Sequence, residues 1–169
     1  MSAPGPKQRL DNGQGGKDNW RTPDDLFALL NRTFGPFTID GAATAEDAKC
    51  TRYFTDAFTE QPVGETIFVN PPYGSGWKAW IALFAAWGQR NNVVALVPSA
   101  TDTEWWQEAH GAAFATILLS GRVRFIDPET GKADGANTTG STVFLFRPGK
   151  QREARMFLWD WRKALEATP

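Results

Sequence analysis

Apolar residues along this chain fall into two patterns, one with helical spacing and one that is continuous. Trp77, Trp80, Phe84 and Trp87 recur at intervals of three and four residues, which predicts a helix of about three turns with one buried face. The residues that follow, 93–97, are all apolar, a pattern typical of a strand covered on both of its faces. A helix followed by such a strand indicates a crossover between parallel strands.

The same alternation extends over most of the chain. A helix is predicted to begin at Thr22 and Pro23, as N-cap residue and first-turn proline, and to end near Gly35. Further helices are predicted over residues 101–109 and 153–165, a helix or turn over 45–53, and strands over 37–40, 67–69, 115–119, 122–126 and 142–146. We therefore expect a doubly wound α/β fold of the Rossmann-like type, whose mostly parallel sheet has an antiparallel C-terminal strand.

Composition along the chain predicts the domain organisation. Residues 1–19 hold little that is apolar besides Leu10, and we expect a flexible N-terminal arm there. Residues 20–169 suffice for one hydrophobic core, so we expect a single domain. Residues 127–141 are rich in Gly, Asp, Thr and Asn, and we expect a mobile loop.

Charge and rare residue types exclude several classes of protein. The formal net charge is −1, so any phosphate contact needs a local basic patch rather than bulk electrostatics. The single Cys50 excludes an intramolecular disulfide, and a single histidine, His110, excludes the usual zinc sites, so we expect no metal. No apolar run approaches the ~20 residues of a spanning helix, and we expect a cytoplasmic protein without membrane contact.

The segment Asn70-Pro71-Pro72-Tyr73 follows the predicted strand at residues 67–69 and carries the most specific chemistry. The side-chain oxygen of Asn70 and the backbone carbonyl of Pro71 can each accept a hydrogen bond from one amino group, which favours attack by its nitrogen on an electrophilic methyl group. The two prolines hold these acceptors still because each fixes its own φ angle and restricts the preceding residue. Tyr73 can stack on a planar base. The alternative is that the segment only ends a strand and turns the chain.

Taken in order, the motifs of this chain resemble those of the phage-type DNA N6-adenine methyltransferases. The resemblance runs from Trp20 to about Phe146. It includes Trp20 with Thr22-Pro23, Phe37-Thr38-Ile39-Asp40-Gly41-Ala42-Ala43, Ala48-Lys49-Cys50 before Tyr53, Phe68 through Asn70-Pro71-Pro72-Tyr73 to Gly74, Leu96-Val97-Pro98 with Thr101-Asp102-Thr103, and Gly121-Arg122 with Phe125. The chain departs from the usual pattern at Gly41, where these enzymes more often have alanine.

The resemblance implies a function, a cofactor and a partner. It implies S-adenosyl-L-methionine as methyl donor and the N6 amino group of adenine in DNA as acceptor, with the base flipped out of the duplex. Asn70, Pro71, Pro72 and Tyr73 are then the catalytic residues. It also implies modification of phage or prophage DNA against restriction, in the cytoplasm of the host cell. We expect a monomer with DNA as its partner.

Candidate cofactor contacts lie at Asn70 and after the two strands that precede it. Asp40 can bind the ammonium group of the methionine moiety while the small Ala42 lets the backbone approach, or Asp40 only caps the next helix. Asp56 can accept from the ribose hydroxyls or the adenine amino group of the cofactor, or it is merely solvated.

The start of the predicted domain supplies another candidate group. Trp20, Thr22 and Pro23 can fold over the cofactor, or they only fix the entry of the first helix.

Contacts with DNA are expected from a few side chains. Tyr73 can stack on the extruded base, and Arg122 and Arg124 can contact a phosphate or a guanine edge, or they are solvated charges at a strand end. No separate recognition domain fits into the chain, so we expect loops to read a short or relaxed site.

Two other functions fit parts of the sequence. The same loop can hold a base in RNA or a glutamine side chain in a protein, although the absence of a glycine-rich cofactor turn argues against this alternative. A catalytically silent nucleic-acid-binding relative is the other alternative, and the intact residues 70–73 argue against it.

Overall fold

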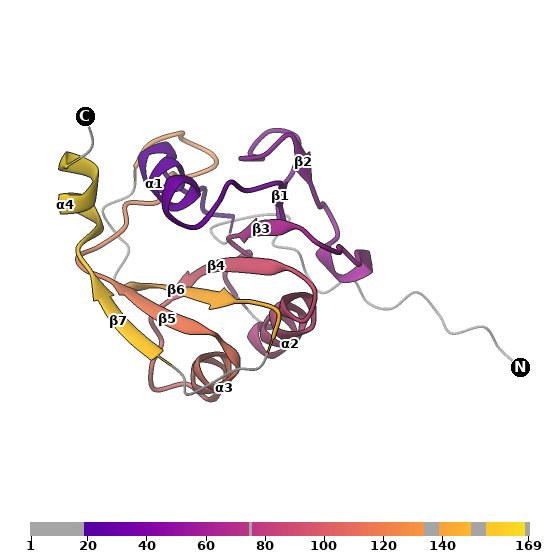
Figure 1. Ribbon diagram of the computed structural model, residues 1–169. Helices are drawn as coiled ribbons and strands as arrows, with labels where there is room; N and C mark the ends of the chain where they lie inside the picture. The colour runs from indigo at the N-terminus through magenta and orange to yellow at the C-terminus, as the bar shows by residue number, and fades with distance from the viewer. Residues whose placement is uncertain (1–18, 75, 134–138, 150–154, 168–169) are drawn as a thin grey trace, which may run out of the picture.

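The computed structural model describes residues 19–74, 76–133, 139–149 and 155–167 (Figure 1). The elements in chain order are α1 (Asp24–Phe34), β1 (Ile39–Asp40), β2 (Arg52–Tyr53), the 3-10 helix η1 (Ala57–Thr59), β3 (Thr66–Val69), α2 (Trp77–Gly88), β4 (Asn92–Pro98), α3 (Glu104–Ala112), β5 (Ala115–Leu119), β6 (Ser141–Phe146), β7 (Arg155–Trp159) and α4 (Trp161–Glu166). The arm predicted for residues 1–19 lies outside the described residues except for Asn19, as does part of the predicted loop at 127–141.

Within the described residues, seven strands form one sheet in the order β2-β1-β3-β4-β6-β5-β7. β6 runs antiparallel to both of its neighbours, and the other pairs are parallel. This confirms the predicted mostly parallel sheet with an antiparallel strand late in the chain. The chain leaves β1 for β2 on one side and returns to β3 on the other, so the strand order reverses between β1 and β3. Ligands of open α/β sheets bind at such a reversal, beyond the carboxyl ends of the strands.

Helices cover both faces of the sheet, as a doubly wound fold requires (Figure 1). α2 and α3 pack on one face, where Phe84 and Trp106 meet Phe144 of β6. α1 and α4 pack on the other face, where Leu30 joins Val143, also of β6. Successive residues of β6 thus enter opposite cores, because side chains alternate across a strand. This central strand is buried throughout.

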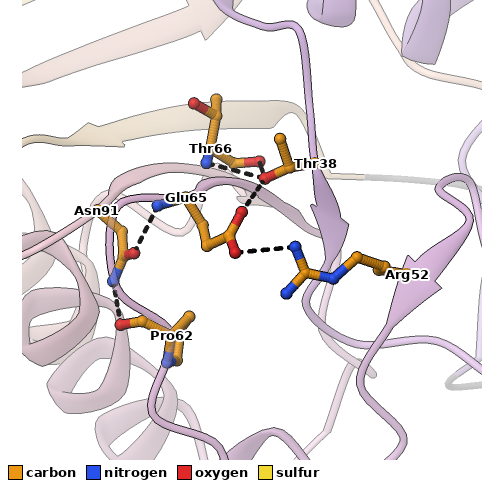
Figure 2. A network of polar contacts seen from close by, with 6 residues as sticks. All are labelled: Thr38, Arg52, Pro62, Glu65, Thr66 and Asn91. Carbon is orange, nitrogen blue, oxygen red and sulfur yellow. Dashed lines mark hydrogen bonds and ion pairs between the residues drawn. The ribbon is translucent and has the colours of Figure 1, made fainter.

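Polar contacts fix the sheet at the edge opposite the carboxyl ends of its parallel strands (Figure 2). Glu65 accepts hydrogen bonds from Thr38 at 2.7 Å and from Arg52 at 2.8 Å, so it joins the chain around β1, β2 and β3. Asn91 is 1% exposed; it accepts from the backbone N–H of Glu65 at 3.0 Å and donates to the Pro62 carbonyl at 2.8 Å. These contacts tie together the starts of β1, β2 and β3, at the end of the sheet away from Asp40 and Asn70.

Three local predictions are wrong in part. Residues 45–47 form turns and the strand β2 follows, where a helix or turn was predicted over 45–53. Residues 122–126 contain an isolated bridge at Ile126 instead of a strand, although Val123 and Phe125 are buried as an alternating pattern predicts. The predicted helix at 153–165 is instead β7 followed by α4, because Arg155–Trp159 pairs with the outer edge of β5.

The first helix also begins differently from the prediction. Pro23 is the N-cap residue of α1 and makes no side-chain cap, while the hydroxyl of Thr22 is buried without a hydrogen-bond partner among the described residues. Thr22 therefore does not cap α1. No helix in the described part of the chain is both long and apolar enough to cross a membrane.

Candidate active site

The carboxyl ends of β1 and β3 bring the two most specific sequence motifs together. The strands are parallel and paired in register, with Asp40 opposite Phe68, so Asn70 follows two residues beyond the neighbour of Asp40. Both side chains line one small cavity at this edge, as the order of strands led us to expect. The segment at residues 19–22 lies against the same cavity.

Asp40 is buried at the end of β1 and is held by backbone donors. Its side chain is 3% exposed, and its carboxylate accepts from the N–H of Lys49 at 2.9 Å and from that of Ala42 at 3.3 Å. Burial disfavours the charged carboxylate and raises the pKa of Asp40 to about 6, while these two N–H donors lower it. No helix begins directly after Asp40, so the helix-capping role considered for it is absent, and its carboxylate instead binds backbone N–H groups of the following loop from the cavity wall.

Asn70 presents one of its two polar atoms to the protein and keeps the other unpaired. Its Nδ2 donates to the backbone carbonyl of Trp20 at 2.8 Å. Its Oδ1 is buried and has no hydrogen-bond partner among the described residues. A buried acceptor without a partner is costly, and a bound ligand that donates a hydrogen bond to it removes that cost. Pro71 is buried and lines the same cavity as Asn70; Pro72 lines this cavity and also a larger one beside it.

Tyr73 packs among aromatic rings at the end of the segment Asn70-Pro71-Pro72-Tyr73. Its ring centroid lies 5.7 Å from that of Phe125, edge to face, and 6.0 Å from that of Trp77. Burial raises the pKa of the Tyr73 hydroxyl, and its oxygen has no hydrogen-bond partner among the described residues. Tyr73 lines neither cavity beside Asn70, so the base-stacking role predicted for it requires the ring to be approached from elsewhere or to move.

Two cavities adjoin at this edge of the sheet. The smaller one, about 50 Å³, lies between Asp40 and Asn70. The larger one, about 340 Å³, extends towards η1 and α2, a size within the range of small-ligand sites. The walls of the two cavities share Asn19, Ala42, Asp47 and Pro72. A ligand with a charged end and a flat aromatic end fits such a pair, because the smaller cavity is polar and the rings of Phe54, Phe58 and Trp80 form part of the wall of the larger one.

Most of the predicted cofactor residues meet here. Trp20, Thr22 and Asp40 line the smaller cavity, and Ala42 lines both. Pro23 lines neither and starts α1 instead.

Asp56, the acidic candidate after β2, also lies outside the cavity walls. Its neighbours Thr55 and Ala57 line the larger cavity, while the Asp56 carboxylate accepts from the N–H of Phe58 at 3.3 Å as the N-cap of η1.

Several wall residues were not identified from the sequence. Arg21 lines the smaller cavity, and Phe54, Phe58 and Trp80 line the larger one. The rings of Phe58 and Trp80 lie 4.8 Å apart. The helical spacing of Trp80 predicted a core residue, and nothing in the sequence showed that its helix also bounds a cavity.

Gly41 lies where the packing behind the site is close. A Cβ atom added there would lie 3.0 Å from a methyl group of Ile67 and 3.1 Å from the ring of Trp87. An alanine at position 41 would therefore require Ile67 or Trp87 to shift by a few tenths of an ångström.

Arg122 and Arg124 are exposed, and neither lines the two cavities. They alternate with Val123 and Phe125, which enter the core, so both arginines face solvent. The ring of Phe125 contacts that of Tyr73, so Arg124 is the sequence neighbour of a residue that touches the segment 70–73. Within the described ranges, no group of three or more His, Cys, Asp or Glu side chains could hold a metal ion.

The architecture and the loop that ends β3 define a Rossmann-like methyltransferase. Residues 11–167 match the family described as DNA N-6-adenine-methyltransferase (Dam), and the chain belongs to this family.

Two relatives illustrate this membership. The DNA N-6-adenine-methyltransferase of Escherichia phage T1 is 27% identical over 158 residues, an alignment that covers 82% of this chain and 66% of the phage protein. The chain thus spans just under two thirds of the length of that relative. The protein YfdM of Escherichia coli strain K12, which carries a methyltransferase name, is 38% identical over 65 residues, 33% of this chain and 71% of that protein.

Proposed function

We propose that this protein transfers a methyl group from S-adenosyl-L-methionine to the N6 amino group of adenine in DNA. One observation carries the proposal: the Oδ1 atom of Asn70 is a buried acceptor without a partner among the described residues, beside the cavity that Asp40 also lines. Family membership and the phage T1 relative, whose name states this activity, support the same reaction.

The catalytic loop supplies hydrogen-bond acceptors for the reacting nitrogen. Adenine N6 is a weak nucleophile because its lone pair is delocalised into the ring. Asn70 Oδ1 and the Pro71 carbonyl each accept one N6 hydrogen, which turns the lone pair out of conjugation and stabilises the positive charge that develops on the nitrogen. The prolines preorganise both acceptors. The target base leaves the stack to reach them, because its amino group is inaccessible inside the duplex.

The residues of the two cavities fit the cofactor. S-adenosyl-L-methionine supplies, when bound, an electrophilic methyl group on a sulfonium. In this proposal the Asp40 carboxylate pairs with the ammonium group of the cofactor, and the Arg21 guanidinium, which lines the same cavity, pairs with its carboxylate. Phe58 and Trp80 bound the larger cavity with flat aromatic faces suited to the adenine ring of the cofactor.

A substrate comparison tests the proposed reaction. The protein is incubated with cofactor labelled in its methyl group and with DNA, RNA or protein in separate reactions, followed by analysis of the modified nucleoside. We expect N6-methyladenine in DNA alone. Label that enters RNA or a protein glutamine instead would show one of the alternative acceptors, and absence of cofactor binding by calorimetry would show a silent nucleic-acid-binding relative.

A pair of asparagine variants tests the proposed role of the loop. We expect Asn70→Ala to lower kcat by about 100-fold or more, as loss of a preorganised electrostatic contact does, while cofactor affinity is largely kept. Asn92→Ala is the matched control, because Asn92 is exposed at the start of β4, whereas Asn70 follows the carboxyl end of the parallel neighbour β3. Wild-type turnover in Asn70→Ala contradicts the mechanism.

A further inference from the structure

Residues 19–22, called the strap here, cross the catalytic edge of the sheet and are fixed on two sides. On one side the strap pairs with the segment after β5: the N–H of Arg21 donates to the Ile126 carbonyl at 3.0 Å, and the N–H of Ile126 donates to the Arg21 carbonyl at 2.9 Å. On the other side the carbonyl of Trp20 accepts from Nδ2 of Asn70 at 2.8 Å. The position of this carbonyl is therefore set by a backbone pair that does not involve the catalytic loop.

The contact with Trp20 determines which way the Asn70 carboxamide points. A carboxamide can turn by half a rotation and exchange its donor and acceptor ends with little change in shape. In the opposite orientation Oδ1 would face the Trp20 carbonyl, so two acceptors would meet in a buried place without a shared hydrogen. The carbonyl thus selects the orientation in which Oδ1 stays unpaired.

We propose that the main-chain carbonyl of Trp20 is a positioning group for the reaction, and that it makes this site specific for asparagine over aspartate at position 70. The inference rests on the proposed function, since it assigns Oδ1 to the N6 amino group. An ionised aspartate at position 70 would place a negative oxygen against the Trp20 carbonyl. Only a protonated carboxyl group can donate to that carbonyl and still accept with its other oxygen.

The variant Asn70→Asp tests the proposal through its pH profile. Asp40, Asp47, Arg21 and Lys49 line the same cavity and are present in both proteins, so the quantity compared is the ratio of the variant's kcat to that of the wild type. Above the pKa of the introduced carboxyl, this ratio rises by about tenfold for each unit by which the pH is lowered. A ratio that is the same from pH 5.5 to pH 8.5, whether near one or near zero, overturns the proposal.

A second pair of variants tests the anchoring of the strap. Ile126→Pro removes the N–H that donates to the Arg21 carbonyl, while Ile126→Val keeps it. We expect Ile126→Pro to lower kcat by about tenfold or more when it is made in the wild type. When it is made in Asn70→Asp and assayed at pH 8, it should lower kcat little further, because both changes disturb the same hydrogen bond. Fully additive losses, or equal kcat in the proline and valine variants, argue against a positioning role.

Failure of this inference is distinguishable from failure of the proposed function. If the wild type does not methylate adenine in DNA, the proposed function is wrong. If the wild type does so and Asn70→Ala is inactive while Asn70→Asp shows no pH-dependent recovery, only the role of the Trp20 carbonyl is wrong. Thermal unfolding of each variant shows that the compared proteins are folded.

Discussion

The carboxylate of Asp40 accepts a hydrogen bond at 2.9 Å from the backbone N–H of Lys49, nine residues further along the chain. The bond closes the loop that leaves β1 and holds a buried acid in the wall of the smaller cavity. Burial raises the pKa of Asp40 from 3.8 to about 6, so its ionisation should change both the stability of the fold and the binding of a cationic ligand.

The first prediction concerns stability against pH. Since the folded-state pKa of Asp40 is above its unfolded value, the group stabilises the native state fully below pH 3.8, and this contribution is lost as the pH rises through about 6. The shift corresponds to about 3 kcal/mol. We expect the free energy of unfolding of the wild type, relative to Asp40→Asn, to fall by this order between pH 4 and pH 7 in urea titrations. A constant difference would show that Asp40 titrates normally.

The second prediction concerns cofactor affinity, which should rise as Asp40 ionises, whereas the stability of the fold should fall. Only the ionised Asp40 can pair with an ammonium group, so we expect calorimetry with S-adenosyl-L-methionine to show weaker binding at pH 5 than at pH 7.5, with the change centred near the pKa of about 6 or below it. Asp40→Asn should bind weakly at both pH values. Equal affinity of the wild type at both would remove Asp40 from the ammonium site.

The aromatic cavity predicts an asymmetry between two phenylalanines. Phe58 bounds the larger cavity against Trp80, whereas Phe34 packs edge to face on Trp159 at the end of α1. We expect Phe58→Ala to weaken cofactor binding by about tenfold, the equivalent of one lost aromatic contact. Phe34→Ala removes the same side chain far from the cavity and should change the dissociation constant by less than about twofold. Calorimetry with S-adenosyl-L-methionine measures both variants. Equal losses would place the cofactor's adenine outside this cavity.

The polar contacts of Asn91 predict a stability effect without a catalytic one. Its amide donates to the carbonyls of Pro62 and Trp87 and accepts from the N–H of Glu65, all in a buried position. We expect Asn91→Ala to lower the free energy of unfolding by about 2–4 kcal/mol, because buried backbone groups lose their partners. The half-exposed pair of Arg52 with Glu65 provides the control.

Arg52→Ala should cost under about 1 kcal/mol, since an ion pair with an exposed partner contributes little. Thermal melts rank the two variants, and methyl transfer assays at 25 °C should give wild-type kcat for both. Similar melting temperatures for Asn91→Ala and the wild type would show that water replaces the lost contacts.

Local pattern was sufficient for the elements that the core surrounds. The apolar run at residues 93–97 predicted β4, and the spacing of Trp77, Trp80, Phe84 and Trp87 predicted α2 within one residue of its end. Burial on fixed faces imposes the period of each element on its own sequence, so the pattern can be read without a partner. The exposed edge strand β7 carries no such pattern and was predicted as helix.

The sequence by itself determined the alternation of strands and helices and the mostly parallel sheet, and it singled out Asn70-Pro71-Pro72-Tyr73 as the candidate catalytic segment, because short-range periodicity and backbone restriction by proline leave their record in adjacent residues. Only the tertiary structure decided that the Trp20 carbonyl, fifty residues away, meets the Asn70 amide, that Trp80 bounds a cavity, and that Asp56 does not. Those relationships depend on how separate elements are placed against one another, and a single sequence records no distances between residues that are remote along the chain.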